Sequence, residues 1–166
     1  MDAAHARLLS VARPGGLIAS TDADTWVAPD WLVRQLELSR AGARAIGGRI
    51  ELCPIERREL PPAVIAGHTE HSRRRFRTVL DQVTDSGAVT DHWQFSGASM
   101  SVTAETYAKV GGLGGGTHSE DEHLERALIA HSVPIDRHLG VRATTSARLY
   151  GRASHGLARV LRELSA

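Results

Sequence analysis

The sequence predicts an α/β fold, in which a mixed sheet is flanked by helices, and three observations carry this prediction. Short apolar runs, such as residues 17–20 and 43–52, have the length of buried strands. Longer segments, such as residues 29–39 and 157–164, repeat apolar residues at helical spacing. Proline and glycine separate the two kinds of segment, as they do at turns between regular elements.

Length and composition indicate one domain over residues 1–166, large enough to bury a core. The net charge of +1 gives no field that would attract nucleic acid or a membrane surface. The single cysteine, Cys53, excludes an internal disulfide and suits a reducing compartment. We find neither a membrane-spanning apolar run nor the apolar region of a secretory signal, so we expect a cytoplasmic protein without a transmembrane segment.

The first third of the chain alternates between helix and strand. Residues 2–12 have a short helical pattern, which a proline and two glycines stop before the strand 17–20. Residues 29–39 form an amphipathic helix with proline just inside its start, the position that proline favours. The strand 43–52 follows, and its two adjacent glycines indicate a bulge or the close approach of another backbone.

A longer helix is expected over residues 60–83, and it carries a cluster of arginines at 73–77. Such a cluster is usually a solvated helix face, and a contact with a phosphate or a lipid headgroup is the alternative. Residues 93–102 are rich in small side chains and are expected to be extended. Thr103 can then cap a helix over residues 104–110.

The last third begins with five glycines between residues 111 and 116, and glycine is needed where a backbone lies close to a ligand. A helix over residues 117–131 follows, with acidic residues in its first turn, where the helix dipole favours them in any protein. Residues 134–139 and 141–146 are extended segments, and an amphipathic helix over 157–164 closes the chain.

Two carboxylates, Asp22 and Asp24, come directly after the strand 17–20. The carboxyl end of a strand is where open α/β sheets place their ligands. Two carboxylates there suit Mg2+ or Mn2+ carrying a substrate phosphate. Taken alone, however, Asp-Ala-Asp is more typical of a turn, because aspartate favours turns and helix starts.

The order of the motifs along the chain adds to this interpretation. Over about residues 1–148 the sequence resembles the C-terminal two-thirds of a glycosyltransferase of family 2, which has the GT-A fold. The resemblance implies a partial GT-A (Rossmann-like) domain that lacks the N-terminal nucleotide-binding βαβ portion. The matching segments are residues 20–32, 97–100, 107–113 and 120–126.

The resemblance implies a nucleotide-diphosphate sugar as donor, a hydroxyl group as acceptor, and Mg2+ or Mn2+ as cofactor. Asp22 and Asp24 match the Asp-x-Asp motif that binds the metal and the donor diphosphate. Asp121 matches the general base that takes the proton of the acceptor hydroxyl, and its neighbour Glu120 is the second choice.

Further positions follow from the same resemblance. The donor-sugar and acceptor side is expected to be lined by Gly97, Ala98, Gly111 and Gly112. A third metal ligand is often a histidine, for which His155 is the first candidate and His118 the second. A solvated surface histidine is the more usual role at each of these two positions.

The sequence thus predicts an enzyme that transfers sugar, and a homodimer is compatible with it. The alternative is a non-catalytic remnant of the fold that serves as a binding or assembly module. A phosphatase or phosphotransferase of the haloacid-dehalogenase type also begins with a strand and Asp-x-Asp. That class requires Thr or Val where this chain has Trp26, which argues against it.

Overall fold

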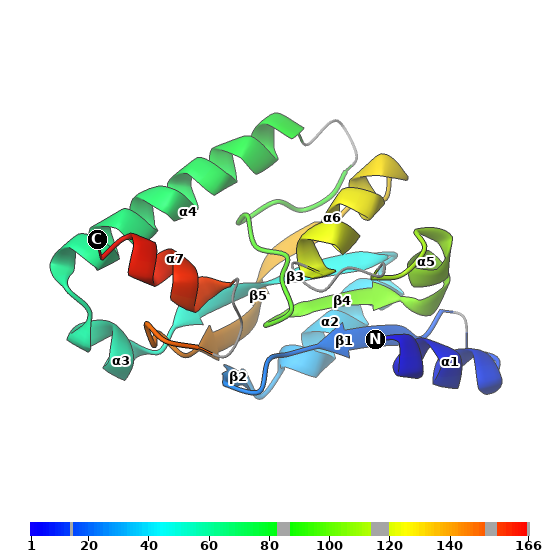
Figure 1. The fold of residues 1–166 in the computed structure, drawn as a ribbon. Coiled ribbons are helices and arrows are strands. Elements are labelled where there is room, and N and C mark those ends of the chain that lie inside the picture. Colours follow the sequence, from blue (N-terminus) through cyan, green and yellow to red (C-terminus); the bar gives the residue numbers. More distant parts are fainter. Residues whose placement is uncertain (14, 83–86, 114–119, 152–155, 166) are drawn as a thin grey trace.

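Helices cover both faces of a five-stranded mixed sheet in the computed structural model, which describes residues 1–13, 15–82, 87–113, 120–151 and 156–165 (Figure 1). The α/β class, with a mixed sheet flanked by helices, is therefore confirmed. None of the described helices is long and apolar enough to cross a membrane. The strands are β1 (Leu17–Ser20), β2 (Thr25–Val27), β3 (Ala45–Leu52), β4 (Met100–Thr103) and β5 (Asp136–Thr145). The helices are α1 (Asp2–Ser10), α2 (Trp31–Arg40), α3 (Pro54–Glu59), α4 (Pro62–Gln82), α5 (Ala104–Lys109), α6 (Glu120–Ala130) and α7 (Leu157–Glu163).

The strands follow the order β1-β4-β3-β5-β2 across the sheet. Strand β4 is antiparallel to both of its neighbours, β1 and β3, so β1 and β3 run in the same direction. Strand β5 is parallel to β3, and β2 is antiparallel to β5 at the far edge. The carboxyl ends of β1, β3 and β5 therefore lie at one edge of the sheet, where open α/β sheets place their ligands.

The apolar core has one part on each face of the sheet. Ala45 and Ile46 are successive residues of β3, so their side chains point to opposite faces. Ala45 belongs to a cluster that includes Leu124 of α6, whereas Ile46 belongs to a cluster that includes Trp31 of α2. Figure 1 accordingly shows α6 above the sheet and α2 below it.

A third cluster closes the carboxyl edge of β3. Leu52, the last residue of that strand, packs with Val64 of α4 and Leu161 of α7. Helices α4 and α7 lie so close together that a side chain added at Gly67 of α4 would lie only 2.9 Å from the side chain of Leu164, the residue after α7. Helices α4 and α7 thus stand side by side at the edge where three strands end.

The two glycines of β3 are needed for the close approach of a neighbouring segment, as the sequence predicted. A side chain on Gly47 would collide with the carbonyl oxygen of Gln94, and one on Gly48 would collide with the Ser99 hydroxyl. The predicted irregularity is also present. After Gly48 the partners of β3 in β5 jump from His138 to Arg142.

Two short elements, β2 and α3, were not predicted from the sequence, and the strand β5 was predicted as two separate segments. Strand β2 has only three residues, too few for a recognisable alternation, and it exists because it pairs with β5. Helix α3 follows Cys53 and begins with a proline. The two extended segments at 134–139 and 141–146 are a single strand, β5, with its irregularity around Gly140.

Helix α5 begins as predicted, with Thr103 as its cap. The Thr103 Oγ1 atom accepts a hydrogen bond from the backbone N–H of Thr106 at 3.3 Å. One turn later, the buried Tyr107 hydroxyl donates to Asp2 at 2.5 Å and accepts from the Leu113 N–H at 3.2 Å. Burial, together with the bond to Asp2, raises the pKa of Tyr107 to about 12. This phenol holds α1 against α5.

Candidate active site

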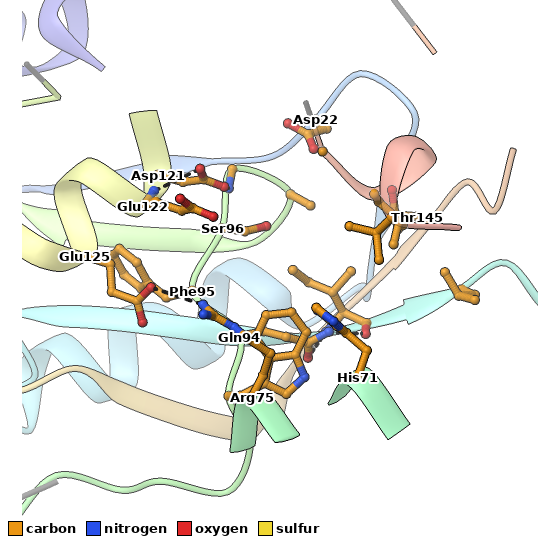
Figure 2. A pocket seen from close by; sticks show the side chains of 18 of the residues that line it. Asp22, His71, Arg75, Gln94, Phe95, Ser96, Asp121, Glu122, Glu125 and Thr145 are labelled. Carbon is orange, nitrogen blue, oxygen red and sulfur yellow. Dashed lines mark hydrogen bonds and ion pairs between the residues drawn. The ribbon is translucent and has the colours of Figure 1, made fainter. Parts of the chain in front are cut away.

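A cavity of about 450 Å³ lies at the edge where β1, β3 and β5 end (Figure 2). Its walls include Asp22 just after β1, Ile50 and Leu52 at the end of β3, and Thr145 at the end of β5. The segment 93–98, which leads into β4, also lines the cavity, together with residues of α4, α6 and α7. The topology of the sheet thus positions the site.

The side chain of Gln94 anchors the segment 93–98 to the sheet. Its amide nitrogen donates to the Ile50 carbonyl at 2.7 Å, and its amide oxygen accepts from the Ile50 N–H at 3.0 Å. One side chain therefore satisfies both backbone groups of a β3 residue that lies beyond the end of β4.

Asp22 and Asp121 are 99 positions apart in the sequence and meet at Gly97. The backbone N–H of Gly97 donates to Oδ2 of Asp121 at 3.3 Å. A side chain on Gly97 would lie 3.2 Å from Oδ1 of Asp22, so glycine leaves room for that carboxylate. Asp121 lies in the first turn of α6, and its Oδ1 accepts from the Glu122 N–H at 2.9 Å. Both oxygens retain lone pairs for a further proton or ligand.

The carboxylates at this site interact electrostatically. Burial raises the pKa of Asp22 above its ordinary value, and repulsion from Asp24 and Asp121 raises it further. Asp24 does not face the cavity freely, because its Oδ2 lies 2.6 Å from a guanidinium nitrogen of Arg148. The backbone carbonyl oxygen of Asp24 accepts a hydrogen bond from the Ser146 N–H at 3.2 Å. This bond ties the turn after β1 to the end of β5.

The raised pKa of Asp22 predicts a stability effect with a definite sign. The folded protein holds this proton more tightly than the unfolded chain, so the contribution to stability is present at low pH and is lost as the pH rises through the raised value. We therefore expect Asp22→Asn to increase the melting temperature modestly at pH 7 in the presence of a chelator. The difference should disappear near pH 3, below the ordinary pKa of 3.8.

Thermal unfolding at a series of pH values between 3 and 7.5 checks this expectation. The matched control is Asp81→Asn on the exposed side of α4, which should leave the melting temperature unchanged at every pH. A lower melting temperature for Asp22→Asn at pH 7 would contradict the account.

Comparison with known proteins adds nothing to this geometry. No family model matches the chain, and no curated protein matches it.

The other residues predicted for the site are only partly brought together. Ala98 is buried and lines the cavity beside Gly97, whereas Glu120 is exposed and is not among the lining residues. Gly111 and Gly112 lie after α5, where Gly112 is close to the Tyr107 ring and neither glycine contributes to the described cavity wall. The candidate third ligands His118 and His155 lie outside the described residues.

The described ranges contain no group of three or more His, Cys, Asp or Glu side chains arranged to hold a metal ion. The donor set nevertheless suits Mg2+ or Mn2+, which is commonly held by one or two carboxylates and completed by substrate phosphates and water. The repulsion that raises the pKa of Asp22 is also what a divalent cation would relieve.

The wall of the cavity that α4 provides was not predicted from the sequence. His68, His71 and Arg75 of α4 line the cavity, and so do Glu122 and Glu125 of α6. A signal was present in the spacing, because 68, 71 and 75 fall on the same helical face as the buried residues Val64 and Val79. Polar side chains on the buried face of a helix need a hydrogen-bond partner or solvent. On α4 these side chains face the cavity instead of the apolar core.

Proposed function

We propose that this protein is a glycosyltransferase, which moves a sugar from a nucleotide-diphosphate donor to a hydroxyl group of an acceptor. The observation that supports this most directly is the meeting of Asp22 and Asp121 at Gly97, on the wall of a cavity at the carboxyl edge of the sheet. The resemblance noted in the sequence assigned these same two residues to the donor diphosphate and to the acceptor proton.

In the proposed reaction, Asp121 accepts the proton of the acceptor hydroxyl while that oxygen bonds to the anomeric carbon. The bond from the anomeric carbon to the diphosphate oxygen breaks at the same time, and the diphosphate leaves with the electron pair. The backbone N–H of Gly97 and that of Glu122 hold the Asp121 carboxylate in position. A free lone pair on each carboxylate oxygen remains for the incoming proton.

Asp22 and Asp24 would hold the divalent metal of such an enzyme. When bound, Mg2+ or Mn2+ would neutralise charge on the leaving diphosphate. Arg148 already contacts Asp24 at 2.6 Å, so Asp22, which faces the cavity, is the carboxylate available without rearrangement.

Calorimetry with UDP- and GDP-sugars tests the proposal. We expect saturable binding that requires Mn2+ and that Asp22→Ala weakens at least about tenfold, a loss of about 1.4 kcal/mol. Asp81→Ala, an exposed substitution of the same chemistry on α4, should bind as the wild type does. Absence of binding of every nucleotide sugar to the folded wild-type chain would refute the proposal.

One observation favours the second candidate, a non-catalytic binding module of the same fold. The ion pair with Arg148 gives Asp24 a cationic partner within the protein, so one of the two expected metal ligands is engaged. In that case UDP and Mn2+ together leave the melting temperature unchanged, because a ligand stabilises only the folded state to which it binds. A rise in the melting temperature with both, but with neither alone, supports the enzyme.

A further inference from the structure

Helix α4 presents a basic wall to the cavity. Its side facing the sheet begins with Val64 and ends with Val79, both almost fully buried. Between them the same face carries His68, His71 and Arg75, which line the cavity instead of packing in the core. The neighbouring arginines 73, 74 and 77 are exposed, whereas the side chain of Arg75 is 40% exposed and lines the cavity.

Arg75 has hydrogen-bond donors to spare. Its guanidinium lies over the Trp93 ring at 5.3 Å from the centroid, and this stacking occupies the face of the group rather than its N–H groups. The nearest carboxylate oxygen, Oε2 of Glu125, is 4.0 Å away, beyond hydrogen-bonding distance. Glu125 is instead bonded to the buried Arg137 at 2.6 Å. Glu125 thus lies near two guanidinium groups and bonds directly to Arg137, so it does not fully neutralise the charge of Arg75.

The two imidazoles lie in the same positive environment. Burial lowers the pKa of His68, and proximity to His71 and Arg57 lowers it further. Burial also lowers the pKa of His71, and Arg75 and Arg74 contribute in the same direction. The His71 ring meets the Trp93 ring edge-on at 5.8 Å between centroids, which fixes its orientation beside Arg75.

The cavity is therefore polarised. Figure 2 shows Asp22, Asp121 and Glu122 on one side and His71 and Arg75 on the other, with Gln94 and Phe95 between them. The carboxylate of Glu125, which also lines the cavity, lies 4.0 Å from Arg75. A cavity of about 450 Å³ is large enough to hold a small molecule that contacts both sides. Such a molecule would present a group for proton transfer to the acidic side and an oxyanion to the basic side.

We infer that Arg75, His71 and His68 form an oxyanion subsite, which binds a phosphate or carboxylate group of the molecule that enters this cavity. The guanidinium supplies planar donors that match an oxyanion, and neutral imidazoles supply one N–H each. This inference rests on the proposed function in one respect. If the donor diphosphate lies against Asp22, the anion on α4 belongs to the acceptor, which is then an anionic molecule with a hydroxyl group.

Nuclear magnetic resonance of the histidine imidazoles tests the subsite with two probes, inorganic phosphate and acetate, at pH 7 and constant ionic strength. We expect saturable shifts of the His68 and His71 signals with millimolar affinity. A preference for phosphate assigns the acceptor to phosphate esters, and a preference for acetate assigns it to carboxylic acids. Failure of both anions to shift these signals overturns the inference.

Variants separate this subsite from a general attraction of anions to basic residues. Arg75→Gln should weaken binding at least about tenfold, whereas Arg77→Gln, an exposed arginine of the same helix, should change it less than about twofold. If Arg75→Gln fails to fold because stacking on Trp93 is lost, His71→Gln takes its place with the same expectation. Equal affinity in the subsite variant and the Arg77 control overturns the inference.

Whether the subsite binds an anion can be tested separately from the proposed function. Neither probe contains a nucleotide or a sugar, and no metal is added, so failure of the anion titration leaves the calorimetric test of the glycosyltransferase intact. Conversely, an anion subsite can be present in a chain that binds no nucleotide sugar.

Discussion

Asp121→Asn is expected to lower the rate of sugar transfer about 100- to 10,000-fold, the usual contribution of a general base. The asparagine side-chain oxygen can still accept the hydrogen bond from the Gly97 N–H, so the local structure should persist. What the variant loses is the ability to accept a proton from the acceptor hydroxyl. Steady-state kinetics should therefore show a fall in kcat, while calorimetry shows donor affinity within about twofold of the wild type.

The matched control is the neighbouring residue. Glu120→Gln removes an exposed carboxylate from the same turn of α6 and should change kcat less than about threefold, because Glu120 does not line the cavity. If the loss of activity instead follows Glu120→Gln and spares Asp121→Asn, the base has been assigned to the wrong carboxylate. Wild-type activity in both variants would exclude Asp121 and Glu120 as the general base.

Glu125→Leu is expected to destabilise the folded protein by about 3–5 kcal/mol, because it leaves Arg137 charged and buried without its partner. The Arg137 side chain is 5% exposed and that of Glu125 is 12% exposed, and their closest nitrogen and oxygen atoms are 2.6 Å apart. For a chain of this length the loss corresponds to a fall of roughly 6–20 °C in melting temperature. Chemical denaturation with urea measures the free energy of unfolding directly.

A double variant separates the lost ion pair from the lost packing. Arg137→Met combined with Glu125→Leu removes both charges together, so it should recover much of the stability that the single variant loses. Glu70→Gln breaks an exposed pair with Arg73 that spans 3.9 Å, and it should change the free energy of unfolding by less than about 1 kcal/mol. A loss below 1 kcal/mol for Glu125→Leu would show that Arg137 finds water or another partner.

Local sequence patterns were sufficient for most of the fold. Strand β1 was predicted with its observed bounds, and α2, β3 and α7 were predicted to within two residues. These elements are short apolar runs or carry apolar residues at helical spacing, and each has a proline or glycine near at least one of its ends. The three-residue strand β2 was missed, because its existence depends on hydrogen bonds with Thr145 and its neighbours in β5.

The candidate site was predictable only where a motif marked it. Asp22 and Asp121 could be paired because their motifs occur in a known order, and the structure brings both to Gly97. The basic wall of α4 carries no motif. Arg75 belongs to a cluster for which the sequence left two roles open, a solvated helix face and a contact with a phosphate or a lipid headgroup. Its place on the cavity wall follows from where the helix packs. The bond of Glu125 to Arg137 likewise joins two elements whose proximity no local pattern reports.

The strand order has a consequence for the way this chain acquires its structure. Strands β1 and β2 are neighbours in the sequence but lie at opposite edges of the sheet. Leu17 pairs with Thr103, and Thr25 pairs with Thr145. At a synthesis rate of about 5–20 residues per second, the partner of β2 leaves the ribosome roughly 6–24 seconds after it. During that interval the backbone N–H and C=O groups of β2 lack the strand with which they pair, so this edge of the sheet can form only after Thr145 has been synthesised.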